Sequence, residues 1–200
     1  MDAEADQDAS STFLSSERLA SLSDGMFGVA MTLLSTTLIL PVQKLTGTAL
    51  EMLHDISGAL FVVALSFAIS GAYWVSHQRQ LTLSRSVTPW QLPLHFAFLF
   101  LIVLLPISTA LLGRGSTTQA VVMIYGGHLA LIGLLNLLIW IEVQRKTVVR
   151  GQIVGSSLTL VLFVAAVAAG AARPELAQYF WYAGFAMAWL GRRLTRISRT

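Results

Sequence analysis

The amino-acid sequence predicts an all-α, polytopic membrane protein with six transmembrane helices. Hydrophobic residues make up 55% of the 200 positions and charged residues only 12%, whereas about 25% of the residues in an ordinary soluble domain are charged. The charges cluster in short stretches and leave apolar runs of about 20 residues, the length that crosses a bilayer as a helix. Lys and Arg are also distributed unequally between alternate loops, as in membrane proteins of defined orientation.

The first half of the chain is expected to contain a tail and three spans. Residues 1–16 are acidic and rich in Ser and Ala, and we expect a disordered tail because few apolar groups offset the entropy of ordering. The apolar runs that follow are 20–41, 57–76 and 92–112. The first ends at Pro41 and lacks the basic start and cleavage site of a signal peptide, so it is expected to stay in the mature protein. The second lies between Asp55 and Arg79, and the third ends before Arg114.

The second half of the chain is expected to contain three more spans. They cover 120–141, 153–172 and 176–191. The sixth is the shortest, because it lies between Glu175 and Arg192, and its alternative is an interfacial helix anchored by Trp181 and Trp189. Residues 17–194 are therefore predicted to form one six-helix transmembrane domain, followed by a basic cytoplasmic tail at 195–200.

The distribution of Lys and Arg predicts that both termini are cytoplasmic, and we expect the protein in the cell (inner or plasma) membrane. With the N-terminus inside, ten basic residues lie on the cytoplasmic side and three outside, as the positive-inside rule requires. The ten are Arg18, Arg79, Arg85, Arg145, Lys146, Arg150, Arg192, Arg193, Arg196 and Arg199, and the three are Lys44, Arg114 and Arg173.

Composition and spacing argue against an enzyme, a metal protein and a nucleic-acid-binding protein. The chain has no Cys, which excludes disulfides, thiol catalysis and zinc–thiolate sites. His54, His95 and His128 have no His, Asp or Glu at metal-ligand spacing, so we predict no metal and no cofactor. His95 and Asn136 are instead expected to bond across helices. The pI is near 9.7, but the basic residues follow the sides of the membrane and form no groove-sized patch.

The first span is unusually polar, and small, apolar and hydroxyl residues alternate along one of its helical faces. Gly25, Val29, Thr32 and Thr36 recur at spacings of four, three and four, with Leu33 beside them. We name these five residues the first-span stripe. Around a symmetry axis, rings of Val or Leu methyls would constrict and dewet a pore, and rings of Thr hydroxyls would replace part of an ion's hydration shell.

The first-span stripe has a second interpretation that needs no pore. Ser and Thr commonly donate to the carbonyls of their own helix, and small residues commonly allow close packing between helices. The carboxylate of Asp24 also needs an explanation, because an unpaired one inside a membrane costs several kcal/mol. Its expected partners are Arg18, in the same chain or a neighbouring subunit, and His77 with Arg79 at the end of the second span.

Three strings of residues resemble a known family. Arg18-x-x-x-Leu22-Ser23-Asp24-Gly25 leads into an apolar helix that contains Thr32. It is followed by Tyr73-Trp74-x-x-His77-x-Arg79 and by Leu104-Leu105-Pro106-x-x-Thr109. Together they resemble the lysosomal potassium channel family, transmembrane protein 175, in its prokaryotic six-span branch, over residues 18–113.

The resemblance implies a homotetramer in the lipid bilayer whose first helices line a central potassium pore. It places the constriction or gate at Val29 and Leu33, and the hydroxyl layer that favours potassium at Thr32, with Thr36 next along the stripe. It also implies a polar network that fixes the pore helix, formed by Arg18, Ser23, Asp24, Trp74 and His77. The only ligand implied is the permeant K⁺ ion.

The sequence departs from the family pattern at four places, and two other functions stay open. Leu22 replaces Phe, Ser76 and His95 stand where Asn is common, and Val29 replaces a bulkier residue. These changes bear on ion selectivity and tightness of closure more than on the fold. The alternatives to a potassium-selective channel are a non-conducting, partner-binding membrane subunit and a proton-coupled transporter that uses Asp24 and His77.

Overall fold

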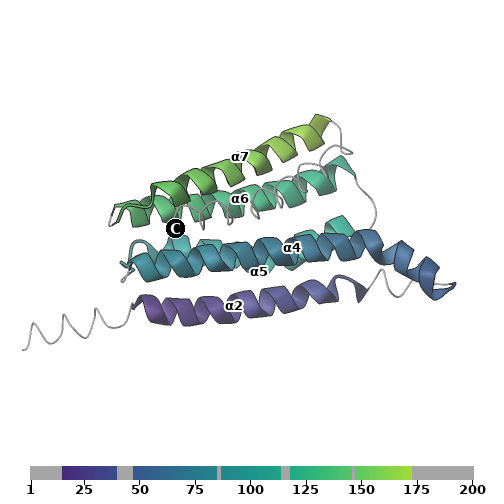
Figure 1. The fold of residues 1–200 in the computed structure, drawn as a ribbon, viewed down its shortest axis with the longest axis horizontal. Coiled ribbons are helices and arrows are strands. Elements are labelled where there is room, and N and C mark those ends of the chain that lie inside the picture. The colour runs from purple at the N-terminus through teal and green to yellow at the C-terminus, as the bar shows by residue number, and fades with distance from the viewer. Residues whose placement is uncertain (1–14, 40–46, 85–86, 114–117, 146, 173–200) are drawn as a thin grey trace, which may run out of the picture.

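A computed structural model describes residues 15–39, 47–84, 87–113, 118–145 and 147–172. Within these ranges the chain forms long helices that run side by side as a bundle (Figure 1). They are α2 (Ser16–Thr36), α4 (Ala49–Ser84), α5 (Leu92–Gly113), α6 (Gln119–Gln144) and α7 (Arg150–Ala172). The predicted tail at 1–16 falls almost entirely outside the described residues, as do the sixth span at 176–191 and the basic tail at 195–200.

Four of the described helices are long and apolar enough to cross a membrane, which makes the chain a multi-pass membrane protein. They are α4, α5, α6 and α7. α2 has 21 residues but is not among the four. Its Ser, Thr and Asp side chains lower its hydropathy, although its length is sufficient for a span. The helices α5, α6 and α7 therefore agree closely with the third, fourth and fifth predicted spans. α4 contains the second predicted span but is longer than it.

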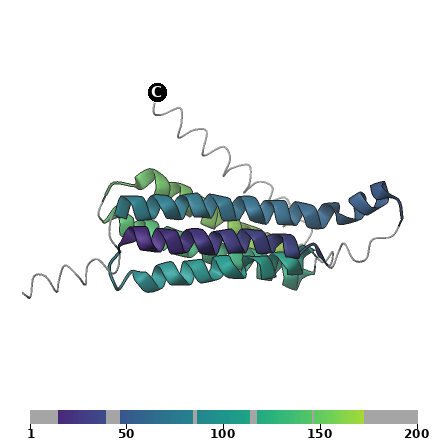
Figure 2. The same cartoon turned by 90° about the horizontal axis from the view of Figure 1, so that it is seen from below.

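The second predicted span was too short at both ends. The prediction placed it at 57–76, whereas α4 has 36 residues and is about 54 Å long, against about 30 Å for a bilayer's hydrocarbon core. The prediction treated charged residues as boundaries, but Glu51, Asp55 and Arg79 lie on the helix and are exposed. The N-terminal part of α4 projects past the other helices (Figures 1 and 2).

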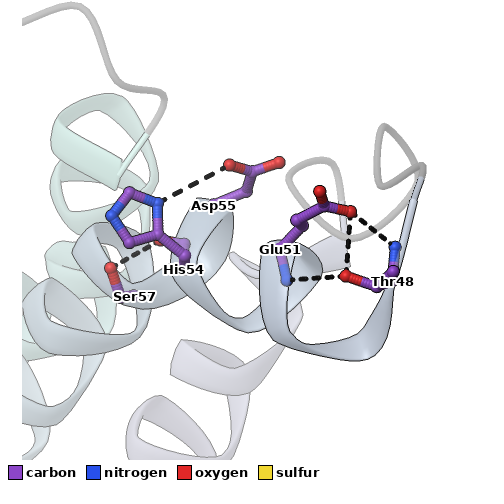
Figure 3. Close-up of polar contacts among 5 residues, drawn as sticks. All are labelled: Thr48, Glu51, His54, Asp55 and Ser57. Carbon is purple, nitrogen blue, oxygen red and sulfur yellow. Dashed lines mark hydrogen bonds and ion pairs between the residues drawn. The ribbon is translucent and has the colours of Figure 1, made fainter.

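A capping box fixes the beginning of α4 (Figure 3). The backbone N–H and the hydroxyl of Thr48 both donate to Glu51 Oε2 at 2.8 Å, and the Glu51 N–H lies 3.4 Å from Thr48 Oγ1. In the next turn Ser57 donates to the His54 carbonyl at 2.6 Å, and His54 Nδ1 lies 3.9 Å from Asp55 Oδ1. The Thr-x-x-Glu pattern at 48–51 is the sequence signal of this helix start.

The core of the bundle is centred on α5. Its contacts reach α2, α4 and α6, whereas α7 packs mainly on α6. The side chains buried most deeply at this centre are Phe98, Leu99, Ile102, Tyr125, Leu129 and Ile132. This arrangement leaves α2 and α7 on opposite edges of the bundle (Figure 1).

Replacing Gly126 with Ala is expected to destabilise the contact between α6 and α7. A Cβ atom at Gly126 would lie 2.8 Å from Val167 Cγ2, whereas at Gly127 nothing lies within 4 Å. Overpacking of this kind costs about 1–3 kcal/mol. We expect G126A to lower the thermal unfolding midpoint of the detergent-solubilised protein and G127A to leave it unchanged or raise it slightly. Equal effects of the two variants would contradict this packing.

Candidate functional site around the first helix

α2 has one face buried in the bundle and the opposite face uncovered. Its buried residues lie at spacings of three and four, and they include Leu19, Ser23, Phe27, Ala30 and Leu34. This face packs between α4 and α5, as Figure 2 shows with α2 in purple at the front. All five residues of the first-span stripe are exposed, Val29 by 57% and Leu33 by 41%. The stripe therefore faces away from the chain's own described helices.

The hydroxyls of the first-span stripe donate to carbonyls of their own helix. Thr32 Oγ1 donates to Gly28 O at 2.8 Å, and Thr36 Oγ1 donates to Leu33 O at 2.7 Å. A hydroxyl has one hydrogen and two acceptor lone pairs, so this bonding uses the hydrogen and leaves the lone pairs to accept. The stripe thus presents oxygen acceptors, which suit a cation, between the apolar Val29 and Leu33 side chains.

Asp24 is held by two donors from α4. Trp74 Nε1 donates to Asp24 Oδ1 at 2.7 Å, and Gln78 Nε2 donates to the same oxygen. Trp74 and Gln78 are one helical turn apart, so both side chains reach the same point on α2. Within the chain, the hydrogen bonds of this carboxylate come from Trp74 and Gln78 and not from the expected His77 and Arg79. The expected pairing with Arg18 of a neighbouring subunit stays a prediction.

A buried chain of hydrogen bonds connects α2, α4 and α5. Ser23 Oγ lies 3.0 Å from His77 Nδ1, and His77 Nε2 lies 3.0 Å from His95 Nδ1. His77 also stacks on Phe98, with ring centroids 5.1 Å apart. Ser23 and His77 are fully buried and His95 nearly so. The expectation that His95 bonds across helices is confirmed, and its partner is His77.

Arg18 lies on a different side of α2 from Asp24. It is exposed and borders a groove of about 340 Å³ that is lined by apolar side chains of α2, α5 and the segment before α5. The lining residues are Ser15, Arg18, Leu19, Leu22, Val87, Leu92 and Phe96. Of the residues in the predicted polar network, the structure joins Ser23 to His77 and Asp24 to Trp74 by hydrogen bonds.

A second polar cluster lies between α4, α6 and α7. Asn136 Oδ1 accepts from Ser76 at 2.8 Å and from Gln80 at 3.0 Å, and Asn136 Nδ2 donates to Ser156 at 3.2 Å. Trp140 Nε1 donates to Ser76 Oγ at 2.9 Å. The predicted bonding of Asn136 across helices is confirmed. Gln78, Gln80 and Ser156 were not predicted, although Gln78 follows Trp74 by four residues, the spacing that places both on one helical face.

Residues 18–106 match the family model described as the endosomal/lysosomal potassium channel TMEM175. A search of the curated proteins finds no match. A solved structure of similar fold is the crystal structure of a lysosomal potassium-selective channel TMEM175 homolog from Chamaesiphon minutus, with a TM-score of 0.78 and 21% sequence identity.

That similarity covers 88% of this chain and 97% of the homolog, so it extends over nearly the whole fold and is not confined to the first helices. The family match covers the stripe, the Asp24 and His77 contacts, and α5 up to Pro106. The resemblance seen in the sequence over 18–113 is therefore confirmed by an independent match and a shared fold. On these two findings, residues 18–106 match the TMEM175 family model, and the chain shares the fold of a TMEM175 homolog.

Proposed function

We propose that the protein is a cation channel that conducts K⁺ passively, with modest selectivity over Na⁺, through a pore lined by α2 from four copies of the chain. The observation that carries the proposal is the uncovered first-span stripe. It places Val29, Thr32 and Thr36 on the face of α2 that is directed away from its own bundle. The match of residues 18–106 to the family model of a potassium channel supports the same function.

The order of residues along the stripe suits conduction. Val29 and Thr36 are seven residues apart, which is about 10 Å along a helix. Four Val29 side chains around an axis would form an apolar ring that restricts hydration, with a Leu33 ring one turn farther along. The Thr32 ring between them would offer hydroxyl oxygens to a partly dehydrated cation. K⁺ gives up its water more readily than Na⁺ at such a layer, because its charge density is lower.

A pore-lining position also accounts for the polarity of α2. A helix in contact with lipid on its outer side must be apolar there, but a helix that lines a water-filled path need not be. We therefore assign α2 as a span. Together with α4 to α7 and the predicted span at 176–191 it gives six, with both termini cytoplasmic in the plasma membrane.

Purified protein in liposomes is expected to carry a K⁺ flux down its gradient without an energy source. Val29→Asn should raise this flux, because an amide ring hydrates the constriction. The matched control is Val161→Asn on α7, where Val161 is 62% exposed and Val29 57%. Absence of K⁺ flux, or an equal change in V161N, would overturn the pore assignment.

The same liposomes separate the two alternatives. A non-conducting subunit gives no flux in any variant. A proton-coupled transporter gives saturable, substrate-dependent transport that Asp24→Asn abolishes, whereas the channel gives a flux that rises with the K⁺ gradient.

A further inference from the structure

A groove that contains two arginines lies between the end of α6 and the beginning of α7. It has a volume of about 660 Å³, and its lining residues are Ile141, Gln144, Arg145, Arg150, Ile153 and Val154. We name these six residues the α6–α7 groove, and none of them is acidic. α7 lies on the opposite edge of the bundle from α2, the helix assigned to the pore (Figure 1). The α6–α7 groove is therefore not used by the proposed channel.

Both arginines of the α6–α7 groove are accessible to an anion. Arg145 Nη1 lies 3.4 Å from Glu142 Oε2, but the Arg145 side chain is still 67% exposed. Arg150 is exposed, and its guanidinium has no hydrogen bond or ion pair with the residues that the structure describes. A guanidinium presents its donors in a planar fork that matches the oxygens of a phosphate. Arg150 is also the first residue of α7, and the first N–H groups of a helix favour a phosphate at that end.

The walls of the α6–α7 groove change from apolar to charged along the helix axes. Ile141 precedes Arg145 by four residues on α6, and Val154 follows Arg150 by four residues on α7. One helical turn thus separates each arginine from an apolar residue on the same face. Both apolar residues lie on the side of their arginine that is directed into the bundle's apolar length. Ile141 is 39% exposed and Val154 67%, so the groove offers a charged rim above uncovered apolar walls.

We propose that the α6–α7 groove binds an anionic phospholipid. Its phosphate would lie between the guanidinium groups of Arg145 and Arg150. One acyl chain would follow the apolar walls past Val154 to Leu158, which is four residues farther along α7 and 48% exposed. A lipid matches both parts of the groove, because it carries a negative head group and an apolar tail in one molecule.

The position of the groove in the membrane agrees with this ligand. α7 begins at the end of the bundle at which α2 begins (Figure 1), and the proposed orientation places that end on the cytoplasmic side. The cytoplasmic leaflet carries anionic lipids, and basic pockets between helices on that side bind their head groups. The choice of leaflet rests on the proposed orientation, whereas the binding itself requires only a multi-pass membrane protein.

Two segments of the chain outside the described residues are less suited to the groove. The segment at 195–200 is basic and would be repelled by the two arginines. The segment at 1–14 carries Asp2, Glu4, Asp6 and Asp8, so its charge suits the arginines. It offers few large apolar side chains to the walls of the groove, and for this reason the lipid is favoured.

Lipid binding to the purified, intact chain tests the proposal without measuring ion flux. Native mass spectrometry in detergent measures the affinity for phosphatidylglycerol, which is anionic, and for phosphatidylcholine with the same acyl chains, which has no net charge. The wild-type protein should prefer phosphatidylglycerol. Arg150→Gln should lower the affinity for phosphatidylglycerol about fivefold and leave that for phosphatidylcholine unchanged. Arg79→Gln is the matched control, because Arg79 is also exposed but lies on α4, and it should change neither affinity.

A second variant tests the apolar walls. Val154→Asn keeps both arginines and should weaken the binding of both lipids, because it places an amide beside the acyl chain. Full phosphatidylglycerol affinity in V154N, together with displacement of this lipid by millimolar inorganic phosphate, would show that the groove binds a free phosphate and not a lipid. The thermal unfolding midpoint of R150Q should equal that of the wild type, because the exposed guanidinium has no partner to lose.

Three other results would overturn the proposal. Equal wild-type affinity for the two lipids would remove the role of charge. Equal losses in R150Q and R79Q would show a general attraction to the basic side of the protein. In D2N/E4Q/D6N/D8N, a higher phosphatidylglycerol affinity that disappears when R150Q is added would show that the acidic segment at 1–14 occupies the groove.

The proposed channel and the proposed lipid site can fail independently. A protein without K⁺ flux whose phosphatidylglycerol preference depends on Arg150 keeps the site and loses the channel. A conducting protein with equal affinity for the two lipids does the reverse.

Discussion

Thr32→Ala should lower the selectivity of the channel for K⁺ over Na⁺. Thr32 Oγ1 already donates its hydrogen to Gly28 O at 2.8 Å, so its contribution to an ion is made through the lone pairs that Ala lacks. If the ring of hydroxyls favours K⁺ by about 1 kcal/mol, its loss reduces the permeability ratio about fivefold. The backbone of α2 should be little disturbed, because Ala is a better helix former than Thr.

The measurement is the reversal potential of reconstituted protein under opposed K⁺ and Na⁺ gradients. Thr159→Ala is a matched control, because the Thr159 hydroxyl on α7 also donates to the carbonyl four residues earlier, at 2.9 Å. T159A should leave the reversal potential unchanged. A T32A channel with the wild-type reversal potential would show that residues other than Thr32 select K⁺ over Na⁺.

The sequence predicted the helices best where apolar runs alone decide the structure. The predicted spans at 92–112, 120–141 and 153–172 agree with α5, α6 and α7 to within a few residues. The error at α4 has a physical cause. Charged residues end an apolar run but do not end a helix, and a helix longer than the bilayer carries them into water, as Glu51 and Arg79 do here.

For the candidate site, the sequence predicted which residues of the first helix share a face. Spacing alone placed Val29 and Thr32 on one face, because helical periodicity fixes which residues share a face. It could not state whether that face was buried or uncovered, since this depends on which side of α2 packs on α4 and α5.

Partners across helices were the least predictable part. Asp24 was expected to attract cationic side chains, yet its donors are the neutral Trp74 and Gln78. Which side chains reach Asp24 depends on the rotation of α4 about its axis and on its position along α2. The local sequence determines neither of these. His77 was placed in the network, but that it bonds to both Ser23 and His95 emerges only when three helices are packed together.

Replacing His77 with Phe should destabilise the bundle. Phe keeps the aromatic stacking on Phe98, whose ring centroid lies 5.1 Å from that of His77, but it removes both nitrogens. Ser23 can turn to a carbonyl of its own helix, whereas His95 Nδ1, 3.0 Å from His77 Nε2, loses its partner inside the bundle. Leaving such a group unsatisfied costs about 1–3 kcal/mol.

The expected result is a clear drop in the thermal unfolding midpoint of H77F in detergent, together with a loss of K⁺ flux as α2 loses its anchor to α4 and α5. His54→Phe tests the same replacement on the same helix, where the side chain is 90% exposed, and should leave the midpoint unchanged. The double variant H77F/H95F should cost less than the sum of the single variants, because either change alone breaks the same bond. Strict additivity, or an equal loss in H54F, would mean that the histidine pair does not hold the first helix in place.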